Sequence, residues 1–231
     1  MADLRLSIVV PCLDEATTIG ATLRNLQHLR RNGAEVIVVD GGSADGTPEL
    51  CRPLCDQLVI AECGRARQMN AGAARASSEN LLFLHADSSL PDRAIDRVVD
   101  GLKRRCWGRF DVQIVGRSRL LPLVGTAMNI RSRLTGIATG DQAIFVRRRV
   151  FEEIGGFPEQ PLMEDIEFST RMRRIQRPCC LREKVRTSGR RWDHNGGLRT
   201  IVLMWRLRLA YALGADAARL SARYTSSGRT R

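Results

Sequence analysis

The sequence predicts an α/β protein with a Rossmann-like, mostly parallel central sheet and helices on both faces. In the first 90 residues, short apolar runs rich in β-branched residues alternate with helical patterns. The apolar runs are continuous rather than alternating, as expected for strands that are buried on both faces of a parallel sheet. Alternation of strands and helices in this order is typical of right-handed crossover units.

The expected elements of this first part follow one another closely. Strands are expected over Leu6–Pro11, Val36–Asp40, Leu58–Ala61 and Leu81–His85. Helices are expected over Glu15–Arg31, Pro48–Leu54 and Arg65–Ser77. In the first helix the apolar residues Ile19, Leu23 and Leu26 recur at helical spacing, and Asn32-Gly33 ends it.

The second part of the chain is less regular. After a loop at 137–142, we expect a strand over Ala143–Val146, a short helix over Val150–Ile154, a helix from about 164 to 174, a last strand over Cys179–Val185 and a C-terminal helix over Leu198–Tyr224. Residues 225–231 form a polar, basic tail that we expect to be disordered. No linker divides the chain, so residues 1–224 are expected to form a single domain.

Composition excludes several classes of protein. Of the 231 residues, 43% are hydrophobic and 27% are charged, which excludes a disordered chain. No apolar run approaches the ~18 residues of a membrane span, and the N-terminus does not have the pattern of a signal peptide. The seven cysteines are therefore expected to be reduced thiols in a cytoplasmic protein. Cys51 and Cys55 lack the matching pair that a zinc site needs.

The net charge of +12 suggests an anionic partner such as nucleic acid, a membrane surface or a phosphorylated substrate. Only Lys103 and Lys184 are lysines, so the other basic residues are arginines. This bias agrees with genomic base composition and also with phosphate recognition by guanidinium groups.

Carboxylates follow three of the expected strands. Asp14 and Glu15 follow the first strand, a segment running from Asp40 to Gly46 ends the second, and His85-Ala86-Asp87 follows the fourth. Such residues can cap the next helix, or they can face a ligand at the carboxyl edge of the sheet. Taken as a set, they favour a ligand site. Neither G-x-G-x-x-G nor G-x-x-x-x-G-K-[ST] occurs, which argues against dinucleotide dehydrogenases and P-loop enzymes.

At these residues the sequence resembles the family 2 glycosyltransferases of the GT-A fold, over nearly the whole chain. The segments that carry the resemblance are Ser7–Pro11 with Glu15, Val36–Thr47, Arg65–Gly72, His85–Asp87, and Gly155–Phe157 followed by Glu164-Asp165. Asp14 stands where the family has Asn, and His85 stands where it has the first Asp of its metal motif. The chain is most similar to a small bacterial subfamily described as associated with radical SAM and selenodomain proteins.

The resemblance implies an inverting, metal-dependent transferase that moves a sugar from a nucleotide-sugar donor, expected to be a UDP-sugar, to an acceptor hydroxyl. It also implies a nucleotide-binding half at 1–90 and an acceptor half at 91–197, with the C-terminal amphipathic helix at 198–224. Mg²⁺ or Mn²⁺ would neutralise the leaving diphosphate.

The implied site residues fall into four groups. The nucleotide-binding residues are Pro11, Glu15, Asp40, Asp45, Arg67, Asn70, Ala86 and Asp87. Arg190 and Arg191 are candidates for the diphosphate, and the metal candidates are Asp87, His85 and His194. Asp165 is expected to be the catalytic base, with Glu164 as an acceptor contact or alternative base. Asp141 is a weaker candidate for contact with a sugar.

Other interpretations remain open at this point. A sugar-1-phosphate nucleotidyltransferase would need a glycine-rich loop where Cys12–Glu15 stands. A nucleic-acid binder would explain the charge, but only 5% of the residues are aromatic, and we expect no nucleic-acid partner. A third alternative is a catalytically inactive relative.

The C-terminal helix also has two interpretations. It carries apolar residues with Arg199, Arg206 and Arg208 between them, so it could pack on the domain or lie on an anionic membrane. In the second case the protein would be peripheral on the inner membrane face, and the acceptor could be a lipid carrier. The sequence predicts neither the sugar, the acceptor nor the oligomeric state.

Overall fold

A computed structural model describes residues 5–195 and 197–226 of the chain. The strands are β1 (Leu6–Cys12), β2 (Ala34–Asp40), β3 (Gln57–Ile60), β4 (Asn80–Phe83), β5 (Ser88–Ser89), β6 (Trp107–Val115), β7 (Phe145–Arg147) and β8 (Cys179–Ser188). The helices are α1 (Ile19–Arg31), α2 (Thr47–Cys51), α3 (Arg65–Arg75), α4 (Ala94–Arg104), α5 (Leu121–Thr135), α6 (Arg148–Glu153), α7 (Glu164–Ile175), α8 (Arg190–Asn195), α9 (Gly197–Ala212) and α10 (Ala217–Ser226). Short 3₁₀ helices cover Arg52–Leu54 and Gly140–Gln142.

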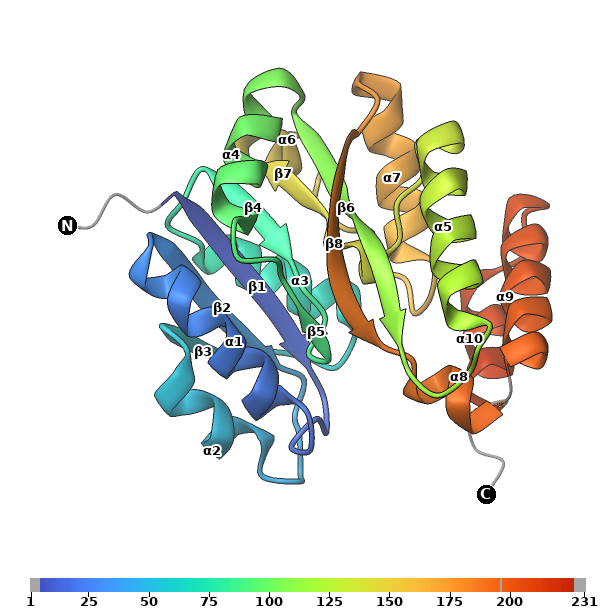
Figure 1. Cartoon of the computed structure of the whole chain (residues 1–231), viewed down its shortest axis with the longest axis horizontal. Coiled ribbons are helices and arrows are strands. Elements are labelled where there is room, and N and C mark those ends of the chain that lie inside the picture. The colour runs from blue at the N-terminus through green and yellow to red at the C-terminus, as the bar shows by residue number, and fades with distance from the viewer. Residues whose placement is uncertain (1–4, 196, 227–231) are drawn as a thin grey trace.

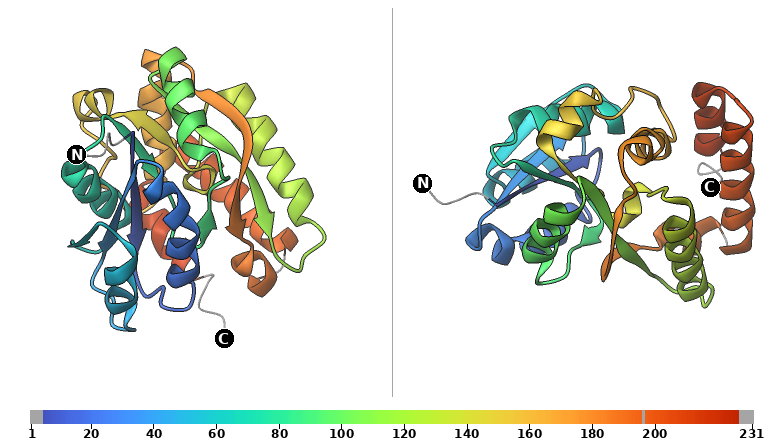
Figure 2. Two further views of the ribbon diagram at one scale, coloured as in Figure 1. Left: turned by 60° about the vertical axis from the view of Figure 1, so that its left-hand side comes forward. Right: turned by 90° about the horizontal axis from the view of Figure 1, so that it is seen from above.

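One mixed sheet runs through the molecule in the order β3-β2-β1-β4-β7-β6-β8-β5 (Figure 1). Strands β1 to β4 are parallel to their neighbours within this group. Strand β7 is antiparallel to both β4 and β6, while β6 and β8 are parallel. Helices surround the curled sheet, as two further views show (Figure 2). The predicted α/β class with a mostly parallel sheet is confirmed.

The apolar residues of β1 divide between two cores because successive side chains of a strand point to opposite faces. Ile8 and Val10 belong to a buried cluster with residues of α1 and α4. Val9 belongs to a second cluster with residues of α3, α6 and α7 on the other face. All seven residues of β1 are buried, which explains why the sequence shows a continuous apolar run.

A close helix–sheet contact fixes α3 against the sheet. Gly72 lies on α3 where an added Cβ would be 2.4 Å from Val9 Cγ1 and 2.8 Å from Val39 Cγ2. The absence of a side chain at this position lets the helix approach the sheet. The first residues of α3 then lie at the carboxyl edge of the sheet, where ligands bind in open α/β folds.

The expected elements of the first 90 residues are confirmed except at their ends. Helix α1 begins at Ile19 rather than Glu15, because the carbonyl of Glu15 accepts the amides of Thr18 and Ile19 in a preceding turn. Strand β4 ends at Phe83, so His85 lies in the following loop. Between 94 and 135 the sequence pattern predicts no elements, and the structure shows α4, β6 and α5 there.

The predicted single helix over 198–224 is wrong, because the structure has α9 and α10 instead. The chain turns at Gly214, whose φ of +89° favours glycine. Helix α10 extends to Ser226, so residues 225 and 226 are helical rather than disordered. The rest of the expected tail lies outside the described residues. Within the described part of the chain, none of the helices is long and apolar enough to span a membrane.

Helix α9 has two apolar faces. Leu207 is 3% exposed and packs in a cluster with Met163 at the start of α7 and Leu220 of α10. On another face, Val202, Trp205, Leu209 and Leu213 are exposed, Trp205 to 74%. The predicted packing of the C-terminal segment on the domain is therefore observed, and an apolar surface remains uncovered by the described residues.

Candidate active site

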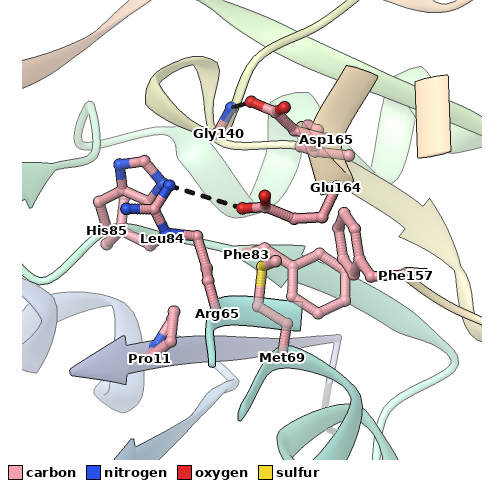
Figure 3. A pocket seen from close by; sticks show the side chains of 11 residues that line it. Pro11, Arg65, Met69, Phe83, Leu84, His85, Gly140, Phe157, Glu164 and Asp165 are labelled. Carbon is pink, nitrogen blue, oxygen red and sulfur yellow. Dashed lines mark hydrogen bonds and ion pairs between the residues drawn. The ribbon is translucent and has the colours of Figure 1, made fainter. Parts of the chain in front are cut away.

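A pocket lies where the two parts of the chain meet at the carboxyl edge of the sheet (Figure 3). Its lining combines Pro11, Phe83, Leu84 and His85 at strand ends, Arg65 and Met69 of α3, and Gly140, Ile144, Phe157, Glu164 and Asp165 from the second part. The pocket floor is apolar and the polar groups converge above it, as in many small-molecule sites.

Glu164 and Asp165 open α7 and face this pocket. Glu164 is 3% exposed. Burial raises the pKa of the Glu164 carboxyl, and the charge of Asp165 adds to this effect while Arg65 opposes it. Asp165 accepts the amides of Gly140, at 2.8 Å, and of Ile166, at 2.7 Å. These donors orient the carboxylate of Asp165, and each of its oxygens keeps a lone pair for an acceptor hydroxyl.

Arg65 is a site residue that the sequence analysis missed. Its Nη1 lies 3.5 Å from Glu164 Oε1, and its side chain is half exposed at the pocket (Figure 3). Arg65 is the first residue of α3, after β3, so it comes from the carboxyl end of a parallel strand. Ligands bind at the carboxyl ends of parallel strands, and applying this rule to β3 as well as to the other three strands would have found Arg65.

His85 and Asp141 form a second polar pair in the site. His85 Nδ1 lies 3.3 Å from Asp141 Oδ1, while the buried Nε2 of His85 has no hydrogen-bond partner among the described residues. Burial acts to raise the pKa of Asp141, but the hydrogen bond and charge of His85, with the charge of Arg65, outweigh it and lower that pKa. A Cβ on Gly140 would lie 2.4 Å from His85 Nε2, so only glycine fits there.

Arg190 joins the end of β8 to the loops after β1 and β4. Its Nη2 lies 2.5 and 2.7 Å from the two carboxylate oxygens of Glu15. Its Nε lies 3.7 Å from Asp87 Oδ2. The hydrogen bond to Glu15 and the charges of Glu15 and Asp87 raise the pKa of Arg190. Three predicted site residues are thus brought together on the same side of the fold.

The carboxylates of Asp40 and Asp45 accept backbone amides of their own loop and, for Asp45, also of the loop after β1. Asp40 is 1% exposed and accepts the amides of Gly42 and Ser43, each at 2.9 Å, as well as the Ser43 hydroxyl. Asp45 accepts the amide of Thr47 at 3.0 Å and that of Ala16 at 2.9 Å. Hydrogen bonds from Thr47 and Ala16 lower the pKa of Asp45. Helix α2 itself has Gly46 at its N-cap and no side-chain cap, so these carboxylates stabilise loops, and their role toward a nucleotide stays a prediction.

Of the other predicted nucleotide residues, one lines the pocket and the rest make contacts within the protein. Pro11 lines the pocket, and the Ala86 carbonyl accepts the Thr22 hydroxyl at 2.7 Å. Arg67 points elsewhere, with Nη1 2.7 Å from Glu62. Asn70 bonds both backbone groups of Phe157, at 2.8 and 2.9 Å. Asn70 therefore positions the loop before α7 in this structure.

A preformed metal centre is not found in the described part of the chain, where no group of three His, Cys, Asp or Glu side chains could hold an ion. Of the predicted set, His85 faces Asp141, and Asp87 faces Arg190. The side chains of His194 and Arg191 lie outside those that the structure describes. A single carboxylate fits an ion that shares its coordination with substrate phosphates, which is how Mg²⁺ is commonly held.

The mixed sheet with a polar site at its carboxyl edge is the arrangement of an α/β enzyme domain that binds its ligand at strand ends. The sequence model of the family described as "Glycosyl transferase family 2" matches residues 7–155, well over half of the chain. The chain belongs to this family. The predictions of the family and of a glycosyltransferase as the class of enzyme are confirmed.

Three similar proteins cover parts of this fold. The succinoglycan biosynthesis protein ExoA of Rhizobium meliloti is 35% identical over 102 residues, which are 40% of this chain and 31% of ExoA. The crystal structure of S. aureus TarS in complex with UDP-GlcNAc has a TM-score of 0.63 at 18% identity, covering 79% of this chain and 58% of that one. The mannosyltransferase PcManGT from Pyrobaculum calidifontis, in complex with GDP-Man and Mn²⁺, has a TM-score of 0.62 at 24% identity, covering 89% and 61%. This chain thus spans less than two thirds of each protein's length.

Proposed function

We propose that the protein transfers a sugar from a nucleotide-sugar donor to an acceptor hydroxyl with inversion at the anomeric carbon. The observation that carries the proposal is the pocket itself. It places the Glu164–Asp165 carboxylate pair opposite Pro11 and His85 at the carboxyl ends of parallel strands. A base on one side and a nucleotide site on the other are what a single displacement requires.

In this reaction the acceptor oxygen attacks the anomeric carbon as the bond from that carbon to the diphosphate oxygen breaks. Asp165 takes the proton of the acceptor hydroxyl. Its hydrogen bonds from the amides of Gly140 and Ile166 hold the carboxylate in place for that proton transfer. Glu164 shares the site in a buried position, where its raised pKa makes it the alternative base.

Arg190 is the group of this chain that we propose for the leaving diphosphate. In the structure it pairs with Glu15 and approaches Asp87, so its guanidinium already lies among the predicted nucleotide residues. Guanidinium groups bind phosphates through two parallel hydrogen bonds. Exchange of a carboxylate partner for the diphosphate keeps the charge of Arg190 paired.

We propose Asp87 as the residue that holds Mg²⁺ or Mn²⁺ together with the donor phosphates. When bound, such an ion neutralises the charge that builds on the leaving diphosphate. The complex of PcManGT with Mn²⁺ supports this proposal by likeness of fold. His85 pairs with Asp141 instead, which favours a role in shaping the loop.

The donor class is tested by screening UDP-sugars and GDP-sugars for release of the nucleoside diphosphate, with Mg²⁺ or Mn²⁺ present. Both nucleotides are included because TarS was solved with UDP-GlcNAc and PcManGT with GDP-Man. Wild type should release UDP or GDP from at least one donor, and Asp165→Asn should release far less. Glu167→Gln, on the same helix and paired with Arg171 at 3.0 Å, is the matched control and should behave as wild type. Failure to release either nucleotide from any donor would argue against the proposal.

A membrane contact is proposed for the exposed face of α9. Val202, Trp205 and Leu209 are exposed along this helix, and the exposed Leu213 directly follows it. An amphipathic helix with Trp and arginines is suited to an anionic bilayer surface. Sedimentation with vesicles of phosphatidylglycerol should retain wild type and lose Trp205→Ser/Leu209→Ser, while binding to neutral vesicles should be weak. Equal recovery of both proteins in the supernatant would refute the contact. The subfamily resemblance and the cytoplasmic location stay predictions.

A further inference from the structure

Two arginines near the site have buried nitrogen atoms without partners. Nε and Nη2 of Arg131 on α5 and Nε of Arg208 on α9 are buried, and they have no hydrogen-bond partner among the described residues. Buried guanidinium groups are normally paired, because removal of their hydration is costly. An unpaired set of this kind is typical of a site whose anion is absent.

Both arginines lie on helix faces that turn toward the same apolar cluster. Met128 of α5 packs in a cluster that Ile201 of α9 also contacts. Arg131 follows Met128 by three positions and Arg208 follows Ile201 by seven, so each arginine lies on the helix face that carries this contact. Figures 1 and 2 show α5, α7 and α9 gathered at the same end of the molecule.

The packing of α9 also brings this space to the active site. Leu207, the neighbour of Arg208, packs against Met163, which directly precedes Glu164 and Asp165. Gln160 donates a hydrogen bond to the Tyr211 hydroxyl at 3.2 Å, which fixes the same loop to the next turn of α9. The inner side of α9 therefore borders the segment that carries the proposed base.

The electrostatics agree with this placement. Burial, followed by the charge of Arg208, lowers the pKa of Arg131 to about 10, and the charges of Asp165 and Asp141 act in the opposite direction. Arg208 in turn helps to lower the pKa of Asp141. Arg131 thus stays charged at neutral pH, is repelled by the charge of Arg208 and lies within electrostatic reach of the site carboxylates.

We propose that Arg131 and Arg208 form an anion-binding pocket that takes a phosphate monoester on the acceptor substrate. A dianion would balance two guanidinium charges, and the planar guanidinium group matches the geometry of phosphate oxygens. The assignment to the acceptor rests on the proposed function, because the acceptor must approach Asp165 while the diphosphate lies at Arg190 and Asp87.

The test is isothermal titration of the whole chain with glycerol 3-phosphate. Wild type should bind it saturably, and glycerol, which lacks the charge, should not bind. Arg131→Gln and Arg208→Gln should each weaken binding at least ~10-fold, because each loses charge-assisted hydrogen bonds. Arg206→Gln is the matched control, since Arg206 is exposed on the same helix, and it should bind as wild type.

Two further controls separate this pocket from the donor site and from loss of folding. Arg190→Gln should bind glycerol 3-phosphate as wild type does. Circular dichroism melting should show that both Gln variants fold, since each removes one of two like charges. If Arg131→Gln does not fold, the glycerol 3-phosphate affinity of Arg208→Gln alone tests the pocket. Wild-type affinity in the folded Gln variants, or no binding by wild type, would overturn the pocket.

Two more titrations identify the source of the phosphate and isolate the proposed function. Decyl phosphate in phosphatidylcholine vesicles is compared with glycerol 3-phosphate, and preference for the former indicates a lipid-linked acceptor. UDP and GDP are titrated separately with Mn²⁺. Nucleotide binding without phosphate binding contradicts only the pocket. Phosphate binding at Arg131 and Arg208 without nucleotide binding contradicts the proposed function and leaves the pocket standing.

Discussion

The two parts of the chain use their charged residues differently. In the first part, Asp40 and Asp45 accept backbone amides of their own loop and build the turns after the strands. In the second part, Glu164 is buried beside Asp165 with a raised pKa, and two buried nitrogens of Arg131 have no hydrogen-bond partner among the residues that the structure describes. Carboxylates that complete a loop stabilise the scaffold, whereas buried groups left unpaired or perturbed mark the place of chemistry.

The largest expected effect is the loss of turnover on substitution of Asp165, which tests the chemical role of the second part. Asp165→Asn should lower turnover by ~10²–10⁴-fold, because the acceptor hydroxyl loses its general base. Nucleotide affinity should stay unchanged, since the residue lies outside the predicted nucleotide loops. The measurement is the rate of nucleoside diphosphate release at saturating donor. Turnover near that of wild type would move the base to Glu164 or elsewhere.

A second prediction tests the junction between the two parts, at the loop that Asn70 holds. Gly155 and Gly156 have φ of +76° and +68°, so alanine at either position should cost ~1–2 kcal/mol of the free energy of unfolding. A Cβ on Gly156 would also meet Asn70 Oδ1 at 2.7 Å, whereas the space around Gly155 is open. Gly156→Ala should therefore be less stable than Gly155→Ala by a further ~1–3 kcal/mol in urea unfolding. Equal stability of the two variants would show that the Asn70 contact does not hold the loop.

Arg190 provides a third prediction, because it crosses from the second part to the nucleotide loops. Arg190→Gln should weaken UDP or GDP binding ~10-fold, through loss of charge-assisted hydrogen bonds to the diphosphate. Its half-exposed pair with Glu15 should contribute at most ~1 kcal/mol to stability, so unfolding should change little. The exposed Arg186 provides the control variant, Arg186→Gln. Unchanged nucleotide affinity would limit Arg190 to a structural contact.

The smallest effect concerns pH and Glu164. Because the folded-state pKa of Glu164 is raised, the folded state binds more protons than the unfolded state above the usual carboxyl range. Stability from this group is present at acidic pH and is lost as the pH rises through the raised pKa. The Tm of Glu164→Gln minus the Tm of wild type should therefore be larger at pH 8 than at pH 4. The same Tm difference at both pH values would contradict the raised pKa.

The first part of the fold was predictable because its strands are buried on both faces and leave continuous apolar runs. The segment from 94 to 135 was missed although Phe110, Val112 and Ile114 alternate as strand residues do. Glu164 and Asp165, predicted from a motif of the family, line the pocket, and their catalytic roles stay predictions. Arg131 and Arg208 could not be found this way, because no motif marks them and the burial of their nitrogens is a property of the folded chain.

For Asp40 and Arg67, the sequence did not predict the direction of the side chain. Both are predicted nucleotide contacts; Asp40 is 1% exposed within its loop and Arg67 pairs with Glu62, so their role toward a nucleotide stays a prediction. A residue type at a strand end predicts where the side chain starts. Its direction is decided by neighbouring donors and acceptors that only the folded chain supplies.

The central claim is that the first part of the chain holds the nucleotide and the second part performs the chemistry. Isothermal titration of UDP and GDP, with and without Mn²⁺, into wild type, Asp87→Ala and Asp165→Asn tests it most directly, with Asp92→Ala at an exposed carboxylate as control. The account predicts Mn²⁺-dependent binding of one nucleotide that is lost in Asp87→Ala and kept in Asp165→Asn. No binding of either nucleotide, or loss in Asp165→Asn with retention in Asp87→Ala, would contradict it.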